Sequence, residues 1–186
     1  MLTFEPMKQA LIVIDVQKDY LPGGAFPLWN TGPVTANIEA AIASARAAGV
    51  PVIQVQHIAH GPAPFFRDGT EGVEIHPPVL AAAPDAKVVV KQHADSFLRT
   101  TLQQVLDELQ VSELLLCGMM TQNCVTHTAI SKSAEKYKVT VLADCCTTVS
   151  EMVHLVALHA LADRVTVASA ADAIGTAVSA AAPPAA

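Results

Sequence analysis

The sequence predicts an α/β fold built on a doubly wound, mostly parallel sheet. Six short runs rich in β-branched and aliphatic residues recur along the chain. Each run is apolar throughout, without polar alternation, which is typical of strands that are covered on both faces. Amphipathic segments separate most of the runs, and this strand–helix alternation favours right-handed crossovers between parallel strands.

The predicted strands coincide with the apolar runs and span residues 10–16, 50–57, 87–91, 113–118, 139–144 and 164–168. The predicted helices span residues 34–49, 100–110, 121–137 and 149–163, and the first ends at a Gly that is soon followed by Pro, a helix stop signal. Two segments, 21–33 and 58–86, interrupt this alternation, and the second holds five prolines. Connections this long are usually functional or mobile, and both follow strand ends, where open α/β sheets bind ligands.

Length and charge narrow the function classes. The 186 residues suit one domain with a single core, expected over residues 1–178, with a flexible tail at 179–186. The net charge is −6 and the Lys and Arg residues form no run, which argues against nucleic-acid binding. The expected partners are therefore a small-molecule substrate and further copies of the chain.

Two further features indicate a cytoplasmic protein. The chain has no stretch of about 18 uninterrupted apolar residues, so no membrane helix is expected. Its first apolar run is short and ends at Asp15, unlike a secretory signal. The four cysteines form no CxxC pair, and the adjacent Cys145 and Cys146 are poorly placed to bond each other, which favours a reducing compartment.

Three residues stand where chemistry is expected. Asp15 and Lys91 end the first and third predicted strands, and Cys124 lies in the first turn of the helix after the fourth. Parallel strands would bring them to one sheet edge as a nucleophilic site. The helix dipole and Lys91 would favour the Cys124 thiolate, Asp15 would accept its proton, and backbone N–H groups between Met120 and Cys124 would hold an oxyanion.

Each of these residues also has a simpler interpretation. Cys124 alone is equally well read as a buried packing residue, Asp15 as a turn cap, and Lys91 as a solvated strand end. Their joint occurrence at one sheet edge is what favours a catalytic site.

Four segments in the same order carry a family resemblance. They read ALIVIDVQKDY (10–20), GTEGVEIHP (69–77), VVVKQHADSF (88–97) and GMMTQNCV (118–125). Together they resemble the isochorismatase-like cysteine hydrolases, which include nicotinamidases and N-carbamoylsarcosine amidohydrolases. The resemblance runs over residues 9–168. It implies a three-layer α/β/α architecture, a six-stranded mostly parallel sheet and, usually, a homo-oligomer.

The resemblance also implies roles for single residues. Asp15 matches the family's general base, Lys91 its charge-stabilising lysine and Cys124 its nucleophile. The Met119–Met120 bond matches a cis peptide, and the N–H groups of Met120 and Cys124 match the oxyanion hole. In the implied reaction Cys124 attacks an amide-like carbonyl, ammonia or an amine leaves, and water hydrolyses the thioester. No cofactor is implied for this reaction.

Two departures limit how the resemblance applies. Nicotinamidases bind a metal through an Asp-x-His pair and two further histidines, whereas this chain has Gln56, His57 and Ile58 in that stretch. His57 and His60 are candidates for a different metal site and His76 stands where a ligand would, but we expect no metal. Isochorismatases cleave a vinyl ether without a cysteine nucleophile, so Cys124 argues against that activity.

Six further residues are candidates for substrate binding because each lies in a strand-end loop or in the turn of the nucleophile: Gln17, Phe26, Trp29, His57, Phe66 and Thr121. Ordinary packing is the alternative for the aromatic residues. The sequence therefore predicts a cysteine-dependent hydrolase of small amides or ureido compounds. The alternatives are an isochorismatase-type or ester hydrolase and a non-catalytic binding protein on the same fold.

Overall fold

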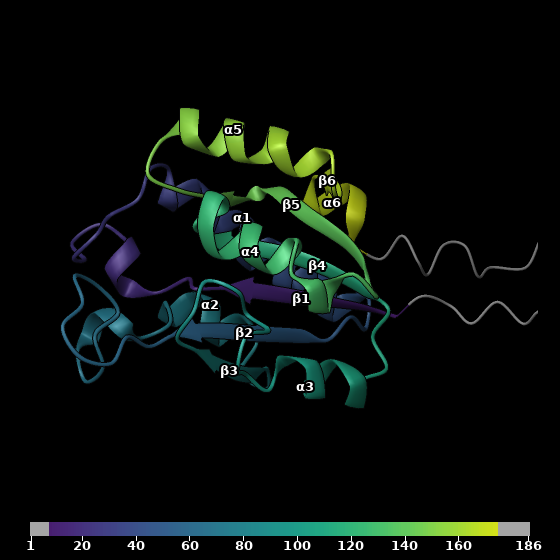
Figure 1. Ribbon diagram of the computed structural model, residues 1–186, viewed down its shortest axis with the longest axis horizontal. Helices are drawn as coiled ribbons and strands as arrows, with labels where there is room; N and C mark the ends of the chain where they lie inside the picture. Colours follow the sequence, from purple (N-terminus) through teal and green to yellow (C-terminus); the bar gives the residue numbers. More distant parts are fainter. Residues whose placement is uncertain (1–7, 175–186) are drawn as a thin grey trace, which may run out of the picture.

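Six parallel strands form one sheet in the computed structural model, which describes residues 8–174 (Figure 1). The strands are β1 (Gln9–Ile14), β2 (Val52–His57), β3 (Lys87–Lys91), β4 (Glu113–Met119), β5 (Lys138–Thr147) and β6 (Thr166–Ala168). Their order is β3-β2-β1-β4-β5-β6, and every pairing is parallel. The predicted doubly wound, six-stranded sheet is thereby confirmed. The predicted tail at 179–186 lies outside the described residues.

Helices cover both faces of the sheet. They are α1 (Thr31–Ala47), α2 (Pro77–Ala82), α3 (Leu102–Glu108), α4 (Thr126–Ala129), α5 (Glu151–Ala162) and α6 (Ala170–Ala173). In Figure 1 α4 lies in front of the sheet, while α1 and α2 lie behind it. This is the three-layer arrangement that was expected. In the described part of the chain, none of these helices has the length and apolar character to span a membrane.

The apolar runs become strands because both of their faces are buried. Every residue of the central strands β1 and β4 is buried, which explains why neither run shows polar alternation. The edge strand β3 instead leaves Val88 and Val90 almost half exposed. The core is therefore densest around β1 and β4, where the strand order reverses.

The helix predicted over residues 121–137 is wrong in its extent. A π-helical turn, η3 (Thr121–Val125), comes first, and α4 then ends at Ala129, before a separate short 3₁₀ turn. Side-chain hydroxyls compete here for backbone groups, which interrupts a regular helix. Thr126 Oγ1 donates to the carbonyl of Thr121 at 2.6 Å, and the Ser131 hydroxyl accepts from the N–H of Ser133.

Gly118 permits an unusually close approach between β4 and β1. Its φ is +121°, and a Cβ added there would lie 2.0 Å from the carbonyl oxygen of Ile14. Only glycine fits this position, because any side chain would collide with the backbone of β1. The peptide bond between Met119 and Met120 that follows is cis. The close approach at Gly118 places the turn after β4 against the end of β1, at the point where doubly wound sheets bind ligands.

Candidate active site

Asp15 and Lys91 form a buried ion pair at the carboxyl edge of the sheet. Lys91 Nζ lies 2.7 Å from Asp15 Oδ2, and both side chains are completely buried. Lys91 reaches across the end of β2 and also donates to the carbonyls of His93 and Ala94, at 3.0 and 3.3 Å. Burial alone would lower the pKa of Lys91, but the neighbouring Asp15 and Cys124 reverse this and raise it. The lysine therefore remains an ammonium ion.

The carboxylate of Asp15 has its ion pair but no regular hydrogen bond. Among the described residues, no donor reaches either of its buried oxygens with hydrogen-bond geometry. Asp15 itself has a φ of +52°, and its N–H donates to the carbonyl of Val55 at 3.0 Å. The Lys91 ammonium is therefore the main polar partner of this carboxylate.

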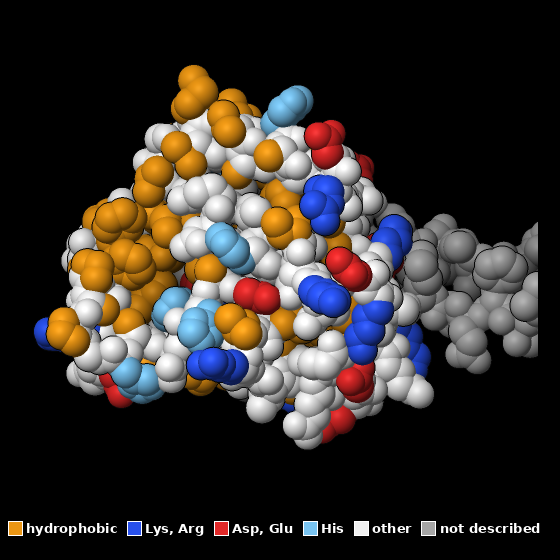
Figure 2. All heavy atoms as spheres, viewed as in Figure 1, with side chains coloured by type: hydrophobic (Ala, Val, Ile, Leu, Met, Phe, Trp, Pro, Cys, Tyr) orange, Lys and Arg blue, Asp and Glu red, His pale blue; other side chains and the backbone are white. Residues whose placement is uncertain are grey.

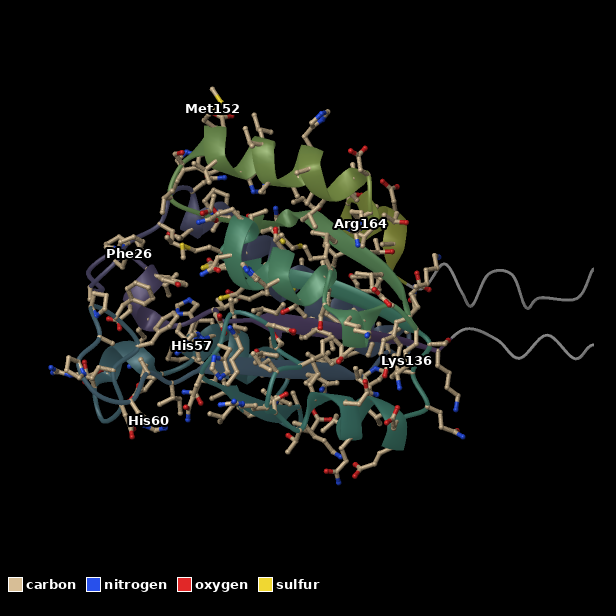
Figure 3. The ribbon with its side chains drawn as sticks, viewed as in Figure 1. Phe26, His57, His60, Lys136, Met152 and Arg164 are labelled. Atoms are coloured by element: carbon tan, nitrogen blue, oxygen red, sulfur yellow. The ribbon has the colours of Figure 1, made fainter. Side chains whose placement is uncertain are left out.

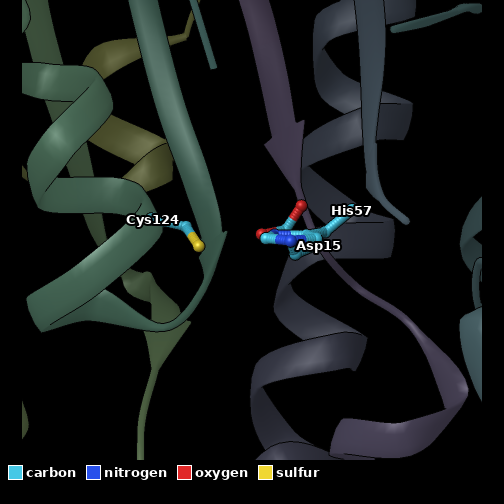
Figure 4. A group of neighbouring side chains, drawn as sticks. All are labelled: Asp15, His57 and Cys124. Atoms are coloured by element: carbon cyan, nitrogen blue, oxygen red, sulfur yellow. The ribbon is translucent and has the colours of Figure 1, made fainter. Parts of the chain in front are cut away.

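Cys124 completes a group of three side chains around this carboxylate. The Cys124 sulfur, a carboxylate oxygen of Asp15 and a ring nitrogen of His57 all lie within 4.8 Å of one another. Figure 4 shows Asp15 and His57 pointing toward Cys124, which comes from the segment that follows β4. The thiol is only 2% exposed. Parallel strand ends have therefore brought Asp15, Lys91 and Cys124 together as the sequence predicted.

We expected the helix dipole and Lys91 to favour the Cys124 thiolate, but burial of the thiol acts in the opposite direction. Burial, followed by the negative charge of Asp15, raises the pKa of Cys124 to about 12, although Lys91 opposes the shift. The helix dipole adds little, because Cys124 lies in the π-helical turn and α4 is only four residues long. At neutral pH the nucleophile candidate is therefore a thiol next to a carboxylate that can take its proton.

His57 lies beside this pair as a neutral imidazole. Its Nδ1 is 3.4 Å from Lys91 Nζ, which assigns that nitrogen as the acceptor and leaves the hydrogen on Nε2. Burial is the main cause that lowers the pKa of His57. The imidazole therefore accepts from the Lys91 ammonium and adds no second positive charge beside it.

Gln17 was assigned to substrate binding, but its side chain instead bonds to the backbone of His57. It is completely buried, and its amide accepts the His57 N–H at 2.8 Å and donates to the His57 carbonyl at 2.9 Å. The same amide nitrogen donates to the carbonyl of Val73 at 2.6 Å. With both its amide nitrogen and its amide oxygen bonded to backbone groups, Gln17 fixes the position of His57.

The remaining candidates for substrate binding divide into two places. Phe26 and Phe66 belong to an aromatic cluster beside His57. Trp29 lies elsewhere, with its ring 6.1 Å from that of His154, whose Nδ1 is 2.9 Å from the hydroxyl of Thr121. Thr121 is completely buried. A substrate-binding role for these residues stays a prediction, as does the oxyanion role of the N–H groups of Met120 and Cys124.

The nicotinamidase type of metal site does not fit this chain. Gln56, in the stretch of the missing Asp-x-His pair, donates its amide to the carbonyl of Val73 at 2.9 Å. His60 instead lies on an exposed loop, 3.4 Å from Asp68. In residues 8–174, no group of potential metal ligands includes His60 or His76. Among these described residues, the one group of potential ligands is Asp15, His57 and Cys124. The Lys91 ammonium already lies next to the Asp15 carboxylate, and it would repel a metal cation bound there.

Sequence reasoning missed Tyr20 and Phe65, which lie in the same aromatic cluster as Phe26 and Phe66. Both could have been found in the sequence. Tyr20 is the last residue of the first segment that carries the family resemblance, and Phe65 directly precedes the candidate Phe66. Periodicity could not select them, because it does not say which loop side chains face a site.

Comparisons with known proteins agree with this fold. The family model described as "Isochorismatase domain" matches residues 9–173. The isochorismatase family protein YddQ of Bacillus subtilis is 41% identical over 143 residues, which cover 76% of this chain and 79% of that protein. The maleamate amidohydrolase of Pseudomonas putida is 33% identical over 153 residues, or 74% of this chain and 71% of the relative. A cysteine hydrolase from Pseudomonas syringae superposes with a TM-score of 0.84 at 25% identity, covering 97% of both chains.

Proposed function

The chain belongs to the isochorismatase domain family, and from this premise we propose that it is a cysteine-dependent hydrolase of small amide or ureido compounds. The observation that carries the proposal is the buried contact between the Asp15 carboxylate and the Lys91 ammonium, with the Cys124 thiol beside it. A nucleophile, a proton acceptor and a fixed cation are the parts that acyl transfer requires. The similarity to a maleamate amidohydrolase supports C–N cleavage as the reaction class.

In the proposed acylation step, the sulfur of Cys124 forms a bond to the substrate carbonyl carbon while its proton passes to Asp15. The carbonyl oxygen gains the negative charge, and the N–H groups of Met120 and Cys124 are our candidates to hold it. Asp15 then gives the proton to the substrate nitrogen, the C–N bond breaks, and ammonia or an amine leaves. Lys91 keeps a positive charge beside Asp15 whenever that carboxylate is ionised.

In the proposed deacylation step, a water molecule attacks the thioester and Asp15 takes one of its protons. The C–S bond breaks, Asp15 passes the proton from water to the sulfur, and the carboxylic acid product leaves. Cys124 is then a thiol again, in agreement with the direction of its pKa. The first proton thus passes from Cys124 through Asp15 to the leaving nitrogen, and the second passes from water through Asp15 to the sulfur, so the cycle consumes only the substrate and one water molecule.

Ammonia release from a panel of primary amides and ureido compounds tests the proposal. We expect release by the wild type, and a loss of at least about 10³-fold in the Cys124→Ala variant. Cys145→Ala is a matched control, because it removes a buried thiol that lies outside the site. Full activity in folded Cys124→Ala would end the proposal. Hydrolysis without ammonia, or silence across the panel, would favour an ester or vinyl-ether substrate or a binding role.

A further inference from the structure

Helix α5 has an exposed apolar face and a buried face, and the buried face carries a histidine. Met152, on the exposed face, is 71% exposed. Figure 2 shows hydrophobic side chains over the beginning of this helix, and Figure 3 shows Met152 pointing away from the sheet. The buried residues of α5 are His154, Ala157 and Leu161, and only the first of them is polar. A buried polar side chain requires a partner, which raises the question of what His154 contacts.

The imidazole of His154 bonds to the segment that carries the nucleophile. Its Nδ1 lies 2.9 Å from Oγ1 of Thr121, a completely buried residue. In the described part of the chain, no other group bonds to this hydroxyl. Burial lowers the pKa of His154, so the ring is neutral at pH 7. A neutral imidazole and a hydroxyl can each donate or accept, so the bond needs no charge on either partner.

Thr121 begins the π-helical turn η3, which also contains Cys124 and which we call the nucleophile turn. Several bonds hold this turn together internally. The carbonyl of Met120 accepts two N–H groups of the turn, at 3.0 and 3.2 Å, and the carbonyl of Thr121 accepts from Thr126 Oγ1 at 2.6 Å. The side chain of Thr121 instead reaches a different element, α5. Its bond to His154 therefore fixes the turn relative to the rest of the molecule.

The segment that leads from β5 into α5 holds the next residue of the nucleophile turn as well. The hydroxyl of Thr148 donates to the side-chain oxygen of Gln122. The same segment fixes Trp29, whose N–H donates to the carbonyl of Thr148 at 2.8 Å and whose carbonyl accepts from the hydroxyl of Thr147. The Trp29 ring centroid lies 6.1 Å from that of His154. Two neighbouring residues of the nucleophile turn are therefore held from the same side.

We propose that His154 is a positioning residue, which holds the nucleophile turn in place through its bond to Thr121. The bond keeps the Cys124 sulfur beside the Asp15 carboxylate, to which its proton passes. His154 acts through Thr121 and takes no part in the proton transfers. An apolar side chain would fill the same place in α5 without needing a partner, so packing alone does not account for an imidazole there. This inference rests on the proposed function, because it concerns the same nucleophile.

Alkylation of Cys124 by iodoacetamide tests the proposal without requiring turnover. The measurement is the second-order rate of modification at pH 7, and peptide mapping by mass spectrometry confirms the residue modified. His154→Leu removes the bond and keeps a side chain of similar size. We expect this variant to react about tenfold more slowly, because the sulfur is displaced from the carboxylate that takes its proton. A rate equal to or above that of the wild type would overturn the proposal.

Two further substitutions separate the hydrogen bond from packing. His154→Asn places an amide where Nδ1 stands, so the bond to Thr121 can still form, and the rate should stay within about twofold of the wild type. His159→Leu is the matched control, since it makes the same change at an exposed position of α5 and should leave the rate unchanged. If His154→Asn reacts as slowly as His154→Leu, the hydrogen bond is refuted as the cause.

A double variant separates position from stability. His154→Leu leaves the Thr121 hydroxyl buried without a partner, and Thr121→Val removes that hydroxyl. Adding Thr121→Val should therefore recover stability in urea unfolding but not the alkylation rate, because the bond is still absent. Wild-type reactivity in the double variant would show that His154 acts on stability alone and would refute its positioning role. If His154→Leu does not fold, the double variant takes its place in the alkylation assay.

Turnover separates this inference from the proposed function. With an amide that the wild type hydrolyses, kcat of His154→Leu should fall about tenfold while KM changes by less than about twofold, because the geometry of acyl transfer is disturbed. An unchanged kcat would refute the role of His154 and leave the proposed function intact. If the wild type releases no ammonia but the alkylation rates change as expected, the positioning role is supported and the proposed amide hydrolysis is refuted.

Discussion

Replacing Lys91 with methionine should destabilise the protein strongly, although the two side chains are similar in size. The ammonium lies 2.7 Å from Asp15 Oδ2, and both side chains are fully buried. At an effective dielectric constant of about 20, two unit charges at this separation attract by about 6 kcal/mol. The desolvation of the two ions offsets much of that attraction in the wild type. The variant loses the attraction but still buries the Asp15 carboxylate.

The expected cost is about 3–5 kcal/mol, the usual range when one partner of a buried pair is removed. For a chain of this length, that corresponds to a fall in melting temperature of about 6–20 °C. Adding Asp15→Asn to Lys91→Met should recover part of the loss, since no charge is then left buried. Together with the two single variants Lys91→Met and Asp15→Asn, the double variant measures the coupling between the two groups.

Thermal and urea unfolding at pH 7 are the assays. The pKa of Lys91 is raised above 10.5, so its stabilising contribution is fully present below about pH 10.5 and fades as the pH rises through the higher folded-state value. Lys87→Met is the control on the same strand, because Lys87 pairs with Glu108 at an exposed position, where an ion pair contributes about 1 kcal/mol or less. If Lys91→Met melts within about 2 °C of the wild type, the reasoning about the buried pair is refuted.

Two further predictions concern the neighbourhood of the nucleophile. Gly118→Ala should lower the free energy of unfolding in urea by at least about 2 kcal/mol, because its Cβ would collide with the backbone of β1. The control is Gly49→Ala, which also has a positive φ but has open space around it, and it should lower that free energy by only about 1 kcal/mol. His57→Gln should slow turnover about tenfold and remove an acid limb below pH 6.5 from the kcat/KM profile. That limb is expected because protonated His57 can no longer accept from Lys91; an unchanged profile in the variant would refute it.

The grouping of the three candidate site residues was predictable, because it depends only on the parallel direction of the strands. Once strands are parallel, residues at their carboxyl ends share one edge, so Asp15, Lys91 and Cys124 could be grouped from chain position alone. The protonation state of Cys124 was not predictable in the same way. Burial decides it, and burial of a turn residue depends on packing that no short motif describes.

The loop side chains were harder to predict for a related reason. Gln17 was assigned to substrate binding from its place after a strand, yet its amide serves the backbone of His57. Asp19 carries no periodic signal, yet its buried carboxylate accepts the N–H of Phe66, far along the chain. Loop positions acquire their partners only from tertiary structure, so their roles follow from contacts and not from sequence spacing.

The charge balance of the buried site explains why a resting thiol suits the proposed mechanism. One ammonium, that of Lys91, stands against one carboxylate, that of Asp15. A resting thiolate at Cys124 would add a second buried anion without a second cation, and the raised pKa of Cys124 expresses that cost. In the proposed reaction the sulfur loses its proton only as Asp15 gains it, so the number of buried anions does not rise. The carbonyl oxygen then receives the negative charge as the sulfur gives it up. In the proposed mechanism the arrival of the substrate therefore activates Cys124, and we expect an uncharged carbonyl compound to suit this charge balance.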